Sequence, residues 1–113
     1  MRVIDKKISI NELKKIASET FGYLVKAVVD IKKEIMVIGG ELHSDEETLL
    51  LEDGSKQNDL WGINLYPDKY PDRDWIEFDS IINLRPSLGN NSRNVENLEI
   101  REKIIEIVNK LIF

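Results

Sequence analysis

The feature that most constrains the fold is a change of hydrophobic period between residues 24 and 43. Apolar residues alternate with polar ones from Val25 to Ile31, and the alternation returns from Met36 to Leu42. A period of two is typical of β-strands that bury one face. The charged residues between the two stretches predict a turn, so we expect this segment to fold as a β-hairpin.

The register of the hairpin follows from which residues must share its buried face. Val29 lies beside Met36, and Ala27 beside Ile38, only if the numbers of paired residues add up to an odd value. A two-residue turn at Lys32-Lys33 satisfies this condition, and so does a four-residue loop centred on the same pair. A slip by one residue would turn Met36 and Ile38 to the wrong face, so we expect this register with either loop.

Two neighbouring glycines, Gly39 and Gly40, follow in the second half of the hairpin. In the expected register they lie opposite Lys26 and Val25. Paired glycines inside a strand mark a bulge, or a place where another backbone or a ligand comes close. We therefore expect a close approach at this end of the hairpin.

Three segments carry helix signals. The Ser-x-x-Glu spacing of a capping box occurs at residues 9–12 and again at residues 44–47. The first predicts a helix that starts at about residue 10 and ends before Gly22, and the second predicts a short helix over about residues 45–53. Apolar residues recur at helical spacing over residues 98–111 and predict a final amphipathic helix.

Two further stretches alternate like strands. Residues 60–66 end at Pro67, and residues 75–85, the longest strand candidate, end at Pro86. Residues 2–5 are a candidate for a short edge strand. None of these segments is separated from the next by a long structureless stretch.

The order of the elements predicts the fold class. Helix, hairpin, helix, two strands and helix indicate an α+β fold with a mainly antiparallel four-stranded sheet and three helices, in the order α-β-β-α-β-β-α. We expect the helices mostly on one face of the sheet. No repeat, linker or low-complexity segment divides the chain, so we expect residues 1–113 to form a single α+β domain.

Composition and charge exclude several classes of protein. The chain has no cysteine, which excludes thiol catalysis, Cys-ligated zinc, iron–sulfur clusters and disulfides, and fits a reducing compartment. Residues 34–80 carry 13 acidic and three basic side chains, and the pI is near 4.9, which disfavours nucleic acid as a partner. The sequence lacks a signal peptide and a long apolar run, so we expect a cytoplasmic protein without a membrane partner.

Four motifs lie between residues 39 and 86. They are Gly-Gly-Glu-Leu-His at residues 39–43, Leu-Leu-Leu-Glu-Asp-Gly-Ser-Lys-Gln at 49–57, Asp-Leu-Trp-Gly-x-Asn-x-Tyr-Pro at 59–67 and Ile-Glu-Phe-Asp-Ser-x-Ile-Asn-x-Arg-Pro at 76–86. In these motifs the chain resembles a family of small uncharacterised prokaryotic proteins that is known only as a domain of unknown function. The resemblance implies a stand-alone prokaryotic protein of one domain, and it assigns no catalytic role to any residue.

The first candidate site is a set of polar residues on the predicted strands. Glu41 and His43 leave the same face if residues 39–43 continue the hairpin, and a histidine with carboxylates suits a divalent metal. Asp79 and Asn83 join them if the strand of residues 75–85 lies nearby. The catalytic candidates are therefore Glu41, His43, Asp79 and Asn83, and the candidate metal ligands are Glu41, His43 and Asp79. The alternative is a solvated sheet face, and no motif implies a cofactor.

The second candidate site is the loop before the last helix. Its polar residues are Arg85, Asn90, Asn91 and Arg93. Guanidinium groups and backbone N–H groups before a helix can hold a small anion such as phosphate or carboxylate. The loop lacks the Gly-x-x-x-x-Gly-Lys pattern of a P-loop, so nucleotide hydrolysis is not implied. The alternative is a turn whose asparagines cap the helix.

Association is the function that we expect from these patterns. The leading hypothesis is a binding module that forms a homodimer, through an edge strand or through an apolar second sheet face made of Val28, Ile35, Val37 and Ile81. The alternative hypothesis is a small metal-dependent hydrolase or an anion-binding protein. The acidic middle of the chain also suits a basic protein partner. Whether the protein is an enzyme is open at this point.

Overall fold

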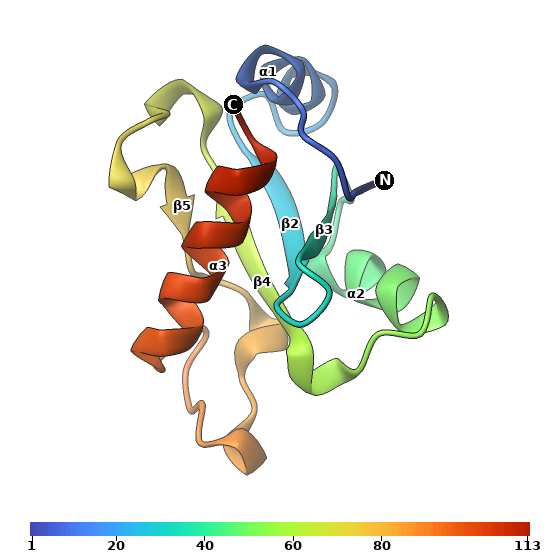
Figure 1. Cartoon of the computed structure of the whole chain (residues 1–113), viewed down its shortest axis with the longest axis vertical. Helices are drawn as coiled ribbons and strands as arrows, with labels where there is room; N and C mark the ends of the chain where they lie inside the picture. The colour runs from blue at the N-terminus through green and yellow to red at the C-terminus, as the bar shows by residue number, and fades with distance from the viewer.

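The computed structural model describes residues 1–113 and contains one antiparallel sheet of five strands (Figure 1). The strands are β1 (Arg2–Ile4), β2 (Val25–Asp30), β3 (Ile35–Ile38), β4 (Leu60–Leu65) and β5 (Ile76–Glu77), in the order β1-β3-β2-β4-β5 across the sheet. The helices are α1 (Ile10–Glu19), α2 (His43–Glu52) and α3 (Leu98–Leu111). The α+β class is confirmed, but the sheet has five strands and not four, because β1 pairs with β3.

The β2–β3 hairpin has the predicted register and the longer of the two loops. Residues 31–34 form a four-residue loop, in which Asp30 Oδ1 accepts hydrogen bonds from the backbone N–H groups of Lys32 and Lys33, both at 2.9 Å. An aspartate that binds the backbone in this way stabilises the turn without requiring glycine. The strand pairs are Ala27↔Ile38, Val28↔Val37, Val29↔Met36 and Asp30↔Ile35.

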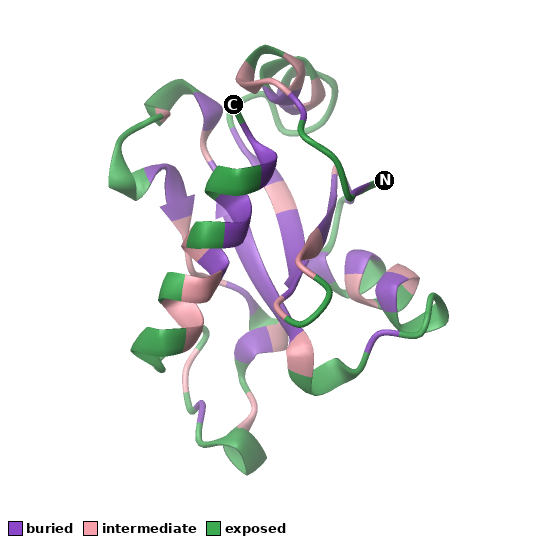
Figure 2. Cartoon of the chain, viewed as in Figure 1, coloured by how far each residue is buried: buried purple, intermediate pink, exposed green.

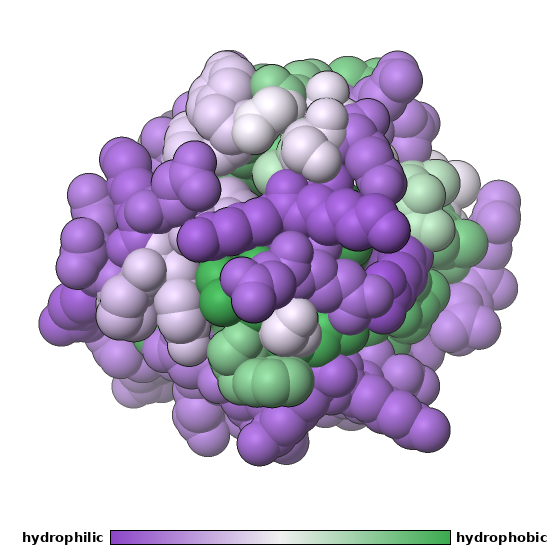
Figure 3. Space-filling model, turned by 90° about the horizontal axis from the view of Figure 1, so that it is seen from above, coloured by the Kyte–Doolittle hydropathy of each residue, from purple (hydrophilic) through white to green (hydrophobic).

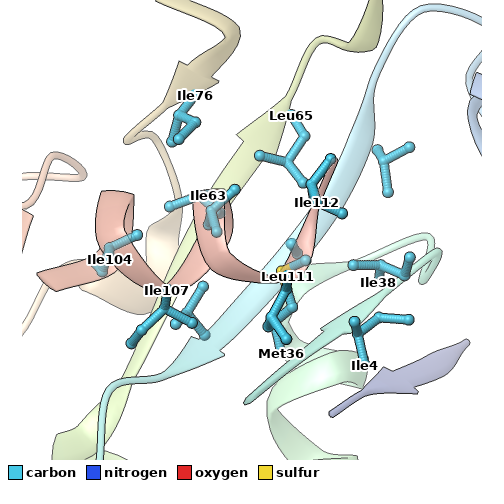
Figure 4. Close-up of a cluster of buried hydrophobic side chains, with 14 of the residues drawn as sticks. Ile4, Met36, Ile38, Ile63, Leu65, Ile76, Ile104, Ile107, Leu111 and Ile112 are labelled. Atoms are coloured by element: carbon cyan, nitrogen blue, oxygen red, sulfur yellow. The ribbon is translucent and has the colours of Figure 1, made fainter. Parts of the chain in front are cut away.

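One face of the sheet, which we call the α3 face, carries the main core. Twenty buried apolar residues form one cluster that joins β2, β3 and β4 to α1 and α3. Ile104, Ile107 and Leu111 of α3 point down onto Ile63 of β4 and Met36 of β3 (Figure 4). The end of α3 is tied to the start of α1, since the Ile8 N–H donates to the Leu111 carbonyl at 2.9 Å. The α3 face is therefore closed by the last helix of the chain.

The opposite face, which we call the α2 face, is covered by α2 and by residues 80–83. Val28 and Val37 are fully buried there with Leu50 of α2 and Leu60 of β4. The central strands of the sheet are mostly in the buried colour in Figure 2. The prediction that the helices lie mostly on one face is therefore incomplete, because α2 packs on the side opposite α3. The apolar second face proposed for a homodimer is occupied by the protein's own helix, and only Ile81 of that set is strongly exposed, at 62%.

Helix α2 begins two residues earlier than predicted. Its N-cap is Leu42, which makes no side-chain cap, and Ser44 lies inside the helix, where Thr48 Oγ1 donates to its carbonyl at 2.9 Å. Residues 39–42 are not a strand, because β3 ends at Ile38. Glu41 and His43 therefore do not share a strand face, and this prediction was wrong.

The predicted strand of residues 75–85 is the largest error. Only Ile76 and Glu77 pair with β4, as β5, and residues 81–83 form a 3₁₀ turn. The side chain of Asn83 takes the place of a paired strand beside Gly62. Its Oδ1 accepts a hydrogen bond from the Gly62 N–H at 2.8 Å, and its Nδ2 donates one to the Gly62 carbonyl at 2.9 Å. A Cβ on Gly62 would lie 2.6 Å from that of Ser80, so the chain crosses β4 where a glycine leaves room.

The outer surface is mostly polar. Hydrophilic side chains cover most of the face seen in Figure 3, and hydrophobic ones show in a smaller central area and at the rim. None of the helices has the length and the apolar character that crossing a membrane requires.

Candidate functional site

A surface hollow of about 790 Å³ lies along the outer edge of β5. Figure 1 shows β5 at the margin of the sheet, next to α3 and below the loop of residues 66–75. We call this hollow the edge groove. Its lining residues are Tyr66, Lys69, Arg73, Asp74, Ile76, Glu77, Phe78, Asp79, Asn94, Arg101 and Ile105.

The loop of residues 66–75 holds one wall of the edge groove in place. Its ends meet where the Tyr66 N–H donates to the Trp75 carbonyl at 2.8 Å. Trp75 is buried in the main core, and the ring of Tyr70 packs edge-on against it with 5.0 Å between centroids. A buried aromatic anchor fixes a loop that has little regular structure of its own.

The backbone of Ile76 and Phe78 faces out of the sheet. Tyr66 and Trp75 form a hydrogen-bonded pair, so the next pair, Leu65 with Ile76, is of the non-hydrogen-bonded kind, and the N–H and C=O of Ile76 point away from β4. Phe78 follows two residues later, directly after the end of β5. Neither backbone group of Phe78 makes a hydrogen bond within the chain. The edge groove is therefore bordered by an unpaired strand edge.

Most charges of the edge groove are already paired. Lys69 lies 3.8 Å from Asp74, and Arg93, just outside the groove, donates through Nε to Asp79 Oδ1 at 2.7 Å. Arg73 points instead to Glu102 of α3 at 3.6 Å. These pairs are exposed, so each contributes little to stability and is easily exchanged for another partner.

Arg101 is the cation of the edge groove that has no acidic partner. Its guanidinium carbon lies 4.4 Å from the centroid of the Phe78 ring, which is a cation–π contact. It forms no ion pair, and its one hydrogen bond, from Nη1 to Asn94 Oδ1, is long at 3.4 Å. Stacking holds the guanidinium in place and leaves most of its donors free.

Glu77 is the matching acid, on the opposite side of β5. Its Oε1 accepts hydrogen bonds from Asn64 Nδ2 and from the Tyr66 hydroxyl, both at 2.9 Å. Burial, with the hydrogen bond to Glu77, raises the pKa of Tyr66 to about 12, so the phenol remains a donor. Glu77 forms no ion pair, and its Oε2 makes no hydrogen bond.

A second polar group lies under the start of α2. Glu46 is fully buried, and its Oε2 accepts from the Gly40 N–H at 3.0 Å while Oε1 has no partner. Burial raises the pKa of this carboxyl to about 9, so it is a neutral acid at pH 7. A Cβ on Gly40 would lie 2.7 Å from the Glu46 side chain, so the predicted close approach at the glycine pair is that of a side chain of the same protein.

The residues predicted for catalysis and metal binding do not form a metal-ligand cluster. Glu41 is exposed, while His43 is buried and its Nε2 lies 2.8 Å from the Ile63 carbonyl. Since a carbonyl only accepts, the ring donates, and burial lowers the pKa of His43. Asp79 pairs with Arg93, and Asn83 binds Gly62. No three histidine, aspartate or glutamate side chains lie close enough together to hold a metal ion.

The residues predicted for anion binding are used mostly inside the protein. Arg85 is nearly buried, pairs with Glu47 of α2 at 3.1 Å and stacks over the ring of Trp61 at 5.1 Å. Burial lowers the pKa of Arg85. Asn90 is buried and donates to the carbonyls of Asn83 and Asn94, both at 2.7 Å, which holds the loop together. Asn91 is exposed and Arg93 is engaged by Asp79, so the four side chains do not form one anion site.

Sequence reasoning missed the edge groove. Its walls come from four separate parts of the chain, residues 66–74, residues 76–79, Asn94 and α3, and nothing in a linear pattern brings them together. The available signal was Arg101, a cation placed on the same side of α3 as Ile105 and next to its buried stripe. The strand pattern of residues 75–85 concealed it, because a long central strand would have left no free edge at Phe78.

The comparisons with known proteins place the chain in a family. The chain belongs to the family described as protein of unknown function (DUF5674), whose model matches residues 2–111. The search of curated proteins and the search of solved structures found no match. Family membership therefore covers the sheet and all three helices, and carries no activity with it.

Proposed function

We propose that this protein is a binding module that takes up an extended segment of another protein as an additional strand beside β5. The observation that carries the proposal is the unpaired edge at Ile76 and Phe78 beside a groove of about 790 Å³. A segment laid along such an edge gains main-chain hydrogen bonds, while the groove accommodates its side chains. The edge is short, so we expect affinities in the micromolar range or weaker.

The other edge of the sheet is less suited to this role. Strand β1 is followed by Asp5, Lys6 and Lys7, and Arg2 within it is held by Glu12 of α1 at 2.9 Å. Charged residues around a short edge strand are a common way to prevent pairing with other chains. No groove of comparable size borders β1, whose nearest hollow is about 260 Å³.

A different protein fits the β5 edge better than a second copy of this chain. Antiparallel pairing of two β5 strands that matches Ile76 with Phe78 of the other copy places Glu77 opposite Glu77. Like charges directly across two strands are destabilising. The α2 face offers no substitute interface, because α2 covers Val28 and Val37. We therefore assign the edge to a partner of different sequence.

The test is a selection of peptides followed by mapping. A display library of random peptides of about eight residues is panned against the protein, and enriched peptides are titrated into ¹⁵N-labelled protein. We expect the largest shifts at the amides of Ile76 and Phe78 and at the groove residues of α3. The Phe78 amide, which has no acceptor in the free protein, should gain protection from hydrogen exchange on binding.

The matched control is a change in the peptide and not in the protein. N-methylation of the residues whose N–H groups face β5 should abolish binding, and N-methylation of the alternate residues should not. Equal binding by both methylated series, or shifts confined to surfaces away from β5, contradicts strand addition. A dimer of the free protein by light scattering, with the Phe78 amide already protected, assigns the edge to a second copy and overturns the choice of partner.

A further inference from the structure

We infer that the segment bound at β5 carries an acidic residue opposite Phe78 and a basic residue opposite Glu77. This inference rests on the proposed strand addition and specifies the partner. It follows from the charges that the edge groove leaves without a counter-charge, namely Arg101 on one side of β5 and Glu77 on the other.

The faces of the added strand are set by those of β5. Ile76 and Phe78 both contact the core of the α3 face, and Glu77 between them contacts Asn64 and Tyr66 on the opposite side. In a sheet, residues directly opposite each other on neighbouring strands point to the same side. The residue opposite Phe78 therefore lies on the α3 side, and its neighbour opposite Glu77 lies on the other.

The α3 side next to Phe78 is occupied by the Arg101 guanidinium. It is half-buried and stacked at 4.4 Å on the Phe78 ring, so a side chain that runs alongside Phe78 meets it directly. The neighbouring cations, Lys69, Arg73 and Arg93, already have acidic partners. A carboxylate can accept two hydrogen bonds from one guanidinium, which is among the stronger polar contacts in proteins. Aspartate or glutamate is therefore the residue that this position selects.

On the other side of β5, Glu77 selects a cationic residue in the bound segment by the same reasoning. Oε1 of Glu77 accepts hydrogen bonds from Asn64 and Tyr66, and its Oε2 makes no hydrogen bond. A lysine or arginine opposite Glu77 supplies the missing charge. Opposite Ile76 the added strand meets Ile76 and Ile105, which favour an apolar side chain. Every strand pair of the sheet is antiparallel, so the partner motif, in chain order, is acidic, basic, apolar.

The experiment uses short peptides of defined sequence. Acetyl-Thr-Glu-Lys-Val-Thr-amide is titrated into the ¹⁵N-labelled protein, together with the matched peptide that has Gln in place of Glu and the peptide in which Glu and Lys are exchanged. We expect both altered peptides to bind about tenfold more weakly, with the same amides of Ile76 and Phe78 shifting. The variant Arg101→Gln should bind the Glu and Gln peptides alike. The control Arg93→Gln, which removes an arginine already paired with Asp79, should keep the preference.

The outcomes separate this inference from the proposal beneath it. If the Glu and Gln peptides bind equally and both shift Phe78, strand addition stands and the charge assignment is wrong. If neither these peptides nor any library peptide shifts Phe78, strand addition itself is wrong. If Arg101→Gln and Arg93→Gln lose the preference for Glu to the same degree, the effect is one of net charge, and the assignment to Arg101 is overturned.

Discussion

The two faces of the sheet are buried by different physical means. The α3 face holds a cluster of 20 buried apolar residues. The α2 face has a cluster of only four buried apolar residues, with Ile35, Leu49 and Ile82 partly buried against it, and it also buries several polar side chains. Its buried polar side chains include those of Asp30, His43, Glu46, Asn64, Ser80 and Asn83.

The difference predicts how each face responds to change. An apolar core loses stability when volume is removed, and pH hardly affects it. A polar face is stabilised by satisfied hydrogen bonds, and it loses stability when one partner is removed or when a buried group changes its charge. The α3 face should therefore carry most of the free energy of unfolding, and the α2 face most of its pH dependence.

The largest effect is expected on the α3 face. The side chain of Ile107 in α3 is fully buried on the side of the helix that faces the sheet (Figure 4). Ile107→Ala therefore leaves a cavity and should lower the free energy of unfolding by about 3–5 kcal/mol. Chemical denaturation at two pH values measures it, and the loss should be the same at both. Glu106→Ala, on the exposed side of the same helix, is the control and should stay within about 0.5 kcal/mol. A loss that varies strongly with pH would break the contrast between the faces.

The second effect concerns Asn83, whose side chain binds the backbone of Gly62 where a neighbouring strand would otherwise pair. Asn83→Ala leaves the N–H and C=O of Gly62 without partners and should cost about 3 kcal/mol. Asn91→Ala, an exposed asparagine of the adjoining loop, should be nearly neutral. Hydrogen exchange of the Gly62 amide gives a local readout, and it should speed up in Asn83→Ala alone. Unchanged exchange there would mean that β4 does not depend on this amide.

The third effect is an increase in the free energy of unfolding. The folded-state pKa of Glu46 is about 9, against an ordinary pKa of 4.5, so its contribution to stability is complete below pH 4.5 and is lost as the pH rises toward 9. Glu46→Gln mimics the neutral acid, and it should raise the free energy of unfolding at pH 7 by about 2 kcal/mol. The difference between the two proteins should shrink to near zero by pH 4.5. A difference that is constant from pH 4.5 to 8 would contradict the burial of a titrating acid.

The smallest effect depends on pH in the opposite direction, because stability is lost as the pH falls. Burial lowers the pKa of His43, so its contribution to stability is present at pH 7 and is lost as the pH falls below the unfolded value of 6.5. In His43→Gln this loss should disappear, while the Gln amide can still donate to the Ile63 carbonyl. The natural protein should therefore lose stability between pH 7 and pH 5, and the variant should not. An identical pH profile in the variant and in the natural protein would show that His43 titrates normally.

Sequence reasoning predicted the parts of the fold in which each pattern has a single physical solution. The register of β2 and β3 could be predicted because a slip would expose Met36 and Ile38. The start of α1 could be predicted because Ser9 caps it, accepting from the Glu12 N–H at 3.1 Å. Both arguments rest on neighbours in sequence or on one hairpin.

The errors arose where a distant contact decides the local structure. The alternation of residues 75–85 fits a strand, but Asn83 reaches Gly62 and ends the pairing after Glu77. Ser44 has the spacing of a cap, but α2 starts earlier, with Glu46 placed to bind the Gly40 N–H. The edge groove depends on these outcomes together, which is why its residues could be selected only from the three-dimensional structure.

The position of α3 in the chain has a consequence for biosynthesis. Strands β1 to β5 have all been translated by residue 77, whereas the helix that covers the α3 face is completed only at residue 111. Throughout that interval a nascent chain presents the apolar side of the sheet to the solvent, without the residues that bury it. Such surfaces are where misassembly begins in newly made proteins. The hydrogen bond between Ile8 and Leu111 joins the segment before α1 to the end of α3, so this contact can form only after residue 111 has been synthesised.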